Sequence, residues 1–74
     1  MKNDNQINIS ELLKKPYLNE VETAAITGRA ITTLRNQRHM GKGISYLKLT
    51  GGRAVRYRTA DVVAYMEAVR IAFE

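Results

Sequence analysis

The sequence predicts a small α+β domain that is mostly helical, and three observations lead to that class. Two short helical segments meet at Gly28, and an amphipathic helix follows Thr59. Two strands in which apolar and polar residues alternate flank Gly51-Gly52. The order of helix, tight turn, helix, basic hairpin and helix is that of a winged helix-turn-helix with a two-stranded β-hairpin as its wing. A chain of 74 residues makes one domain, expected over 17–74 after an N-terminal arm, 1–16.

The arm is expected to hold one short helical turn. Ser10 can cap this turn, and Pro16 ends it because the residue before a proline avoids the α region. Leu12 and Leu13 are expected to pack on the domain. Tyr17-Leu18 then predicts a short extended segment.

The first helix of the domain is expected over about residues 20–27. Asn19 and Glu22, three residues apart, form the Asn variant of a capping box. Gly28 ends the helix because glycine tolerates the left-handed conformation of a tight turn. The apolar residues at helical spacing are Val21, Ala24 and Ala25, and the two alanines permit a close approach by another helix.

A second helix is expected over about residues 30–39, and Gly41-Lys42-Gly43 ends it. Only Ile31 and Leu34 are strongly apolar, so the buried face is narrow. The wide opposite face carries Thr, Arg, Asn and Gln, the side-chain types that bond base edges and phosphates. This helix is therefore the candidate for recognition.

Two alternating strands are expected at 46–49 and 54–58, joined by a glycine-rich turn with Arg53 at its tip. By the period of two, one face of the hairpin points inward and holds Leu47, Leu49, Val55 and Tyr57. The other face points outward and holds the cations Lys48, Arg56 and Arg58.

The last helix is expected over about residues 60–73. Thr59 is its predicted cap, and Asp61 lies in the first turn, where the helix dipole favours a negative charge. Its apolar stripe, expected to pack in the core, consists of Val62, Tyr65, Met66, Val69 and Phe73. Two further apolar residues, Val63 and Ile71, lie off this stripe.

Charge is unevenly distributed along the chain. Residues 29–58 contain eight Lys and Arg and no Asp or Glu, so this segment is +8, whereas the remaining residues (four basic, seven acidic) sum to −3. The net charge is +5 and the pI is near 9.9. A solvated basic surface is one explanation, and an electrostatic footprint for the phosphates of a nucleic acid is the sharper one.

Several functions are excluded or disfavoured by composition. The chain has no cysteine and one histidine, His39, which excludes disulfides, thiolate metal sites and multi-histidine metal sites. The acids lie away from the basic segment, without the paired arrangement that catalysis requires. We therefore expect no enzyme, no catalytic residue, no cofactor and no metal.

The sequence also lacks the signs of a membrane protein. No uncharged apolar run approaches the roughly 18 residues of a membrane span. The polar N-terminus carries Asp4 and does not look like a signal peptide. We therefore expect a cytoplasmic, nucleoid-associated protein that does not bind membranes.

Several motifs occur together at the spacing of a known family. They are Tyr17-Leu18-Asn19-Glu20-Val21 with Ala24 and Gly28, Thr33-Leu34-Arg35, Tyr46-Leu47-Lys48-Leu49 with Gly52-Arg53, Val55-Arg56-Tyr57-Arg58, and Asp61-Val62 with Tyr65-Met66. Over about residues 17–68 the chain resembles the excisionase family, which includes AlpA-like regulators and phage excisionases. The fold of that family is similar to the MerR-type winged helix.

The resemblance implies sequence-specific binding of double-stranded DNA. The second helix would enter the major groove, and the basic wing would reach the backbone or the adjacent minor groove. The residues implied to contact DNA are Arg29, Thr32, Arg35, Asn36, Arg38, Lys48, Arg53, Arg56 and Arg58.

Three positions depart from the family pattern. Ala30 stands where a Ser usually caps the second helix, a loss worth about 0.5–2 kcal/mol. Ile31 replaces a residue that is often polar or basic, which removes one expected contact. Ile44-Ser45 replaces a Pro-Pro pair, so we expect a looser connection to the first strand.

Two classes of function remain open at this point. Within DNA binding, the chain could serve as a phage or mobile-element excisionase or as a small transcriptional regulator, with an integrase or recombinase as a protein partner. The alternative is a protein-interaction module that docks on an integrase, a terminase or another regulator. We expect a monomer in solution that binds DNA in several adjacent copies, through the Val63 and Ile71 flank or through the arm.

Overall fold

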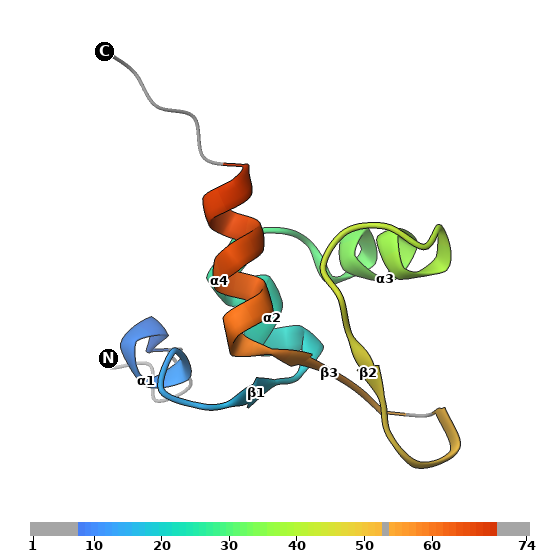
Figure 1. Cartoon of the computed structure of the whole chain (residues 1–74), viewed down its shortest axis with the longest axis horizontal. Helices are drawn as coiled ribbons and strands as arrows, with labels where there is room; N and C mark the ends of the chain where they lie inside the picture. The colour runs from blue at the N-terminus through green and yellow to red at the C-terminus, as the bar shows by residue number, and fades with distance from the viewer. Residues whose placement is uncertain (1–7, 53, 70–74) are drawn as a thin grey trace, which may run out of the picture.

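In this computed structural model, the described residues are 8–52 and 54–69. They form four α-helices and a three-stranded antiparallel sheet, so the class is α+β and mostly helical, as predicted (Figure 1). The helices are α1 (Ile9–Leu12), α2 (Glu20–Thr27), α3 (Ile31–His39) and α4 (Thr59–Ala68). The strands are β1 (Tyr17–Leu18), β2 (Leu47–Lys48) and β3 (Val55–Arg58), with a 3-10 turn, η1 (Thr50–Gly52), between β2 and β3.

The arm forms the predicted helical turn but with a different cap. Asn8 is the N-cap of α1, and its side chain accepts a hydrogen bond from the backbone N of Glu11 at 3.3 Å. Ser10 lies inside the helix, so the prediction that it caps the turn is wrong. Leu12 is buried as expected, whereas Leu13 is exposed.

α2 is the element that the sequence predicts best. Asn19 Oδ1 accepts from the backbone N of Glu22 at 2.8 Å, and Glu22 Oε1 accepts from the backbone N of Asn19 at 2.9 Å, which completes the capping box. Gly28 ends the helix at φ 75°. The buried face differs from the prediction, because Val21 is exposed and Thr23 is fully buried. The Thr23 hydroxyl is satisfied by donating to the Asn19 carbonyl at 2.9 Å.

α3 follows α2 after a short turn and has the predicted limits to within one residue. Its N-cap, Ala30, makes no side-chain hydrogen bond, because alanine has no polar group to accept one. Leu34 is buried and Ile31 is half-buried, so the narrow apolar face points inward. The helix ends at His39, before Gly41 and the rest of the glycine-rich segment.

The hairpin has an additional partner, because β1 joins it and the strand order is β1-β3-β2. Tyr17 pairs with Arg58, and Leu18 pairs with Tyr57. Partners directly opposite each other in an antiparallel sheet point to the same face. Leu18 and Tyr57 are both buried and define the inner face of the sheet, which α2 and α4 cover (Figure 1).

The faces of β2 are reversed relative to the prediction. Leu47 pairs with Arg56 and Lys48 with Val55, so Leu47 lies on the outer face and is exposed. The cause is the register, since a shift of one residue exchanges the two faces of a strand. The backbone N of Leu49 donates to the Ala54 carbonyl at 2.8 Å, so the pairing continues directly to the turn.

α4 begins one residue earlier than predicted and without a side-chain cap. Thr59 is its first helical residue, and its hydroxyl donates to the Lys15 carbonyl while its backbone N donates to the Pro16 carbonyl at 3.0 Å. Val62 is fully buried, whereas Val63 and Val69 are exposed. Phe73 and Ile71 lie outside the described residues, so the predicted end of the stripe and the Val63–Ile71 flank are not covered.

The core lies between the inner face of the sheet and the helices. The buried residues that pack together come from the arm, the sheet, the connection before β2 and α4: Leu12, Leu18, Ile44, Tyr57 and Val62. Among the described residues, no helix combines the length and apolar character that crossing a membrane requires.

Candidate functional site

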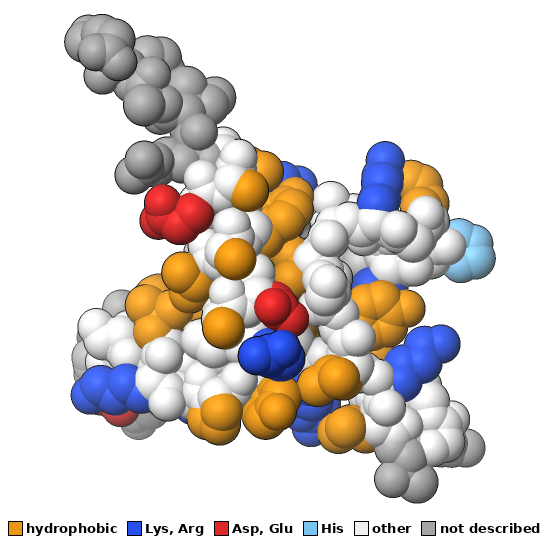
Figure 2. All heavy atoms as spheres, viewed as in Figure 1, with side chains coloured by type: hydrophobic (Ala, Val, Ile, Leu, Met, Phe, Trp, Pro, Cys, Tyr) orange, Lys and Arg blue, Asp and Glu red, His pale blue; other side chains and the backbone are white. Residues whose placement is uncertain are grey.

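The outward face of α3 carries three of the predicted contact residues. Thr32, Arg35 and Asn36 are exposed, while Leu34 faces the core. On the face shown in Figure 2, acidic side chains lie over α4 and α1, and none lies over α3. The exposed Thr32, Arg35 and Asn36 thus give α3 a polar outward side.

Arg29, in the turn before α3, is half-buried against α4. Its guanidinium carbon lies 5.6 Å from the centre of the Tyr65 ring. A cation at this distance over an aromatic ring is attracted by the ring quadrupole. This contact links the turn to α4 and helps to fix the direction in which α3 leaves α2.

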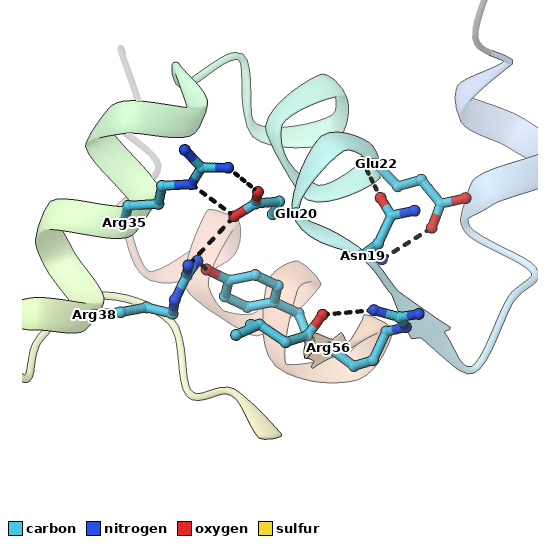
Figure 3. A network of polar contacts seen from close by, with 8 residues as sticks. Asn19, Glu20, Glu22, Arg35, Arg38 and Arg56 are labelled. Carbon is cyan, nitrogen blue, oxygen red and sulfur yellow. Dashed lines mark hydrogen bonds and ion pairs between the residues drawn. The ribbon is translucent and has the colours of Figure 1, made fainter. Parts of the chain in front are cut away.

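Arg35 is held by a carboxylate from the beginning of α2. Its Nε donates to Glu20 Oε1 at 3.2 Å and its Nη2 donates to Glu20 Oε2 at 2.5 Å (Figure 3). This is the parallel two-bond geometry in which a guanidinium and a carboxylate fit best. The Arg35 side chain is nevertheless 61% exposed, so it remains accessible from solvent.

Arg38 lies deeper, one turn along α3. Its side chain is 15% exposed, and its guanidinium donates to the Tyr57 hydroxyl at 2.7 Å and to Glu20 Oε1 at 3.3 Å. The guanidinium also lies over the ring of Tyr46, 5.7 Å from its centre. Arg38, one of the residues implied to contact DNA, therefore also joins α3 to the sheet.

Glu20, Arg35 and Arg38 line one groove on the molecular surface, which has a volume of about 460 Å³. It lies between the start of α2, α3 and the start of β3, and its walls are Asn19, Glu20, Val21, Arg35, Arg38, Ala54, Val55 and Arg56. Three arginines of the acid-free segment 29–58 thus line this groove together with the carboxylate of Glu20.

The electrostatics of the groove favour the charged form of its carboxylate. The hydrogen bond from Arg35 lowers the pKa of Glu20 below its ordinary value of 4.5, and the hydrogen bond from Arg38 adds to it, against the opposing effect of burial. Burial by itself would raise the pKa of Glu22, but hydrogen bonds from Lys15 and the Asn19 backbone outweigh it. Both carboxylates are therefore stabilised as anions.

The predicted wing residues do not lie on one face. Arg56 and Arg58 share the outer face of the sheet, and Arg56 Nη1 donates to the Val55 carbonyl at 2.9 Å. Lys48 is exposed but belongs to the opposite face, because it pairs with Val55. The prediction that Lys48 points outward with Arg56 and Arg58 is wrong for this reason. Arg53 lies outside the described residues.

Two residues that organise this site, Glu20 and Tyr57, carry no local sequence signal of that role. In the sequence, Glu20 stands out only as part of the Tyr17–Val21 motif, and Tyr57 is expected only on the inward face of the hairpin. Their arginine partners are 15 to 19 positions away along the chain. No local pattern reports such pairings, because they depend on how α3 packs against α2 and β3.

No protein-family model matches the chain, and no curated protein matches it.

Proposed function

We propose that the protein is a winged helix-turn-helix that binds double-stranded DNA sequence-specifically. α3 enters the major groove, and the β2–β3 hairpin reaches the backbone or the adjacent minor groove. The cellular role is that of an excisionase-like or AlpA-like protein, acting in DNA excision or as a small transcriptional regulator. If the protein acts in excision, its protein partner is an integrase or recombinase.

The observation that carries this proposal is the rotation of α3. The helix buries Leu34 and exposes Thr32, Arg35 and Asn36. Asn can form a two-bond contact with an adenine edge in the major groove, and the fork of an Arg can bind a guanine edge or a phosphate. A helix that needed only solubility could carry Glu on this face, yet residues 29–58 contain no acid.

The charge of the same segment supports contacts with the DNA backbone. The +8 of residues 29–58 covers α3 and the hairpin, the two elements that would flank a phosphate backbone. Lys and Arg side chains that neutralise phosphates release condensed counterions, which supplies much of the binding free energy. Arg29 is held against Tyr65 at the start of α3, where backbone contacts would position the helix.

The test is a salt titration of binding to a random-sequence duplex, measured by fluorescence anisotropy. We expect measurable affinity at low salt and a steep linear fall of log K against log salt, with a slope of about −0.9 for each phosphate neutralised. Selection from a randomised duplex library then yields the preferred site. A protein with no duplex affinity at low salt would contradict the proposal.

The wing has its own test, Arg53→Ala. The wing role predicts that this variant binds the selected site more weakly by about 1–3 kcal/mol, as expected for a charge-assisted contact. The free energy of unfolding should hardly change. Unchanged affinity would show that the hairpin tip does not touch DNA.

A protein-interaction module is the second candidate, and one observation favours it. The outer face of the sheet exposes Tyr17 and Leu47 beside Arg56 and Arg58. Exposed apolar side chains among arginines on one face of a sheet suit a protein partner. The salt titration separates the two candidates, since a module that binds only protein has no salt-dependent affinity for duplex DNA.

A further inference from the structure

We propose that the groove between α3 and β3 is a phosphate-binding site that the Glu20 carboxylate occupies and closes in the absence of ligand. The ligand is a phosphate group, and under the proposed function its source is the DNA backbone. Glu20 then acts as an internal competitor that DNA must displace.

The first argument is the composition of the groove. Arg35, Arg38 and Arg56 all line it, and two of them donate to the same carboxylate, that of Glu20. The two guanidinium charges of Arg35 and Arg38 therefore face the single negative charge of Glu20. Arg56, whose charge acts on Glu22, adds a further cation to the wall of the groove. This excess suits a second or a more highly charged anion.

The second argument is the geometry of the occupied site. Glu20 accepts two parallel bonds from Arg35, at 3.2 and 2.5 Å, and a third from Arg38 at 3.3 Å (Figure 3). A phosphate accepts the same two-bond fork from a guanidinium and offers more acceptor oxygens than a carboxylate. The carboxylate thus holds the arginines in an arrangement that a phosphate can take over.

The third argument is that the site can open without unfolding the protein. The Arg35 side chain is 61% exposed and that of Glu20 is 23% exposed, so solvent and ligand reach the pair. Arg38 is 15% exposed and is also bonded to Tyr57. Arg38 therefore forms a fixed base for the site, while Arg35 and Glu20 can separate.

Two binding measurements on Glu20→Gln test this inference. Glutamine keeps the shape of the side chain and removes its charge. Glu11→Gln is the matched control, because Glu11 is an exposed acid of α1 and its removal changes the net charge equally. We expect Glu20→Gln to bind random duplex DNA about tenfold more tightly than the parent, the equivalent of one charge-assisted hydrogen bond, and Glu11→Gln to gain less than about twofold.

Inorganic phosphate is the second probe, because it does not depend on the proposed function. Titration followed by NMR should show tighter phosphate binding to Glu20→Gln than to Glu11→Gln, and Arg35→Ala in the Glu20→Gln background should remove that gain. In the parent protein, phosphate should shift the Arg35 Nε–H resonance as the carboxylate is exchanged. This last measurement holds even if the Glu20 variant does not fold.

The possible results are separable. Equal affinities of the two Gln variants for DNA and for phosphate, or an Arg35 resonance unmoved by phosphate, overturn the phosphate site. Tighter phosphate binding by Glu20→Gln without duplex affinity in any variant keeps the phosphate site and rejects the proposed DNA binding. If Glu20→Gln binds the duplex as tightly as the parent does, the proposed DNA binding stands, but Glu20 is not a competitor that DNA must displace.

Discussion

The guanidinium of Arg38 donates a hydrogen bond of 2.7 Å to the hydroxyl of Tyr57. The bond joins α3 to the central strand of the sheet, and both partners are largely shielded from water, with Tyr57 fully buried. The buried hydroxyl accepts a hydrogen bond from a cation that is largely shielded from water. The orientation of α3 relative to the sheet therefore depends on a polar contact as well as on Leu34.

Tyr57→Phe should consequently destabilise the protein. Removing the hydroxyl leaves Arg38 with one fewer acceptor in a shielded position, which costs about 1.5–3 kcal/mol for a hydrogen bond to a charged group. Urea denaturation measures the free energy of unfolding. Tyr17→Phe is the control, because Tyr17 lies on the exposed outer face, and it should change stability by less than about 0.5 kcal/mol. Equal effects of the two substitutions would contradict this role of the Tyr57 hydroxyl.

Gly43 and Gly41 offer a second matched pair. Both have positive φ, 90° and 69°, but a Cβ on Gly43 would lie 2.8 Å from Oε1 of Gln37, whereas a Cβ on Gly41 meets nothing within 4 Å. Gly41→Ala should lose about 1–2 kcal/mol from the left-handed conformation alone. Gly43→Ala should lose about 1–3 kcal/mol more stability than Gly41→Ala, because the added methyl group is overpacked against Gln37. Thermal denaturation compares the two, and similar melting temperatures would show that Gln37 moves aside at little cost.

Stability should fall in acid partly through Glu20. The pKa of Glu20 is lowered in the folded protein. The contribution of its carboxylate to the free energy of unfolding is therefore complete above pH 4.5, the ordinary pKa of the group, and is lost as the pH falls through the lowered pKa. Glu20→Gln has no such group and should lose less stability than the parent between neutral pH and about pH 3. Urea denaturation at a series of pH values provides the comparison. Parallel curves for parent and variant would contradict the assignment.

Leu34 and Asn36 test the rotation of α3. Leu34→Ala removes a buried side chain and should cost about 2–5 kcal/mol of stability. Asn36→Ala alters an exposed residue and should leave stability nearly unchanged while relaxing preference for one base of the selected DNA site, by about 1–3 kcal/mol. Calorimetry and binding to single-base variants of the site measure these effects. A stable Leu34→Ala protein with altered sequence preference would mean that the helix faces the other way.

Features set by neighbouring residues were predictable from the sequence. The Asn19–Glu22 capping box, the left-handed Gly28 and the inward position of Leu34 are all found in the structure. Each depends on side chains within a few positions, where helix periodicity and capping chemistry apply. The lack of a side-chain cap at Ala30 was predictable for the same reason.

Features that join distant parts of the chain were not predictable. β1 was expected only as an extended segment, but it pairs with β3 about 40 positions later. The hydroxyl of Thr59 was expected to cap α4, yet it bonds the Lys15 carbonyl. The alternation of Leu47 and Lys48 showed that they lie on opposite faces but not which face is buried, because that depends on the register with Arg56. The groove around Glu20 arises from such long-range packing as well.

The position of β3 in the sheet has a consequence for synthesis on the ribosome. β3 is the central strand, yet it is the latest of the three strands in chain order. Leu18 therefore emerges from the exit tunnel long before Tyr57, the residue opposite it. A nascent chain that stops before residue 55 has neither the strand that joins β1 to β2 nor the buried face of α4. Folding is thus expected to wait until translation of β3 and α4, and earlier fragments are expected to remain exposed to chaperones and proteases.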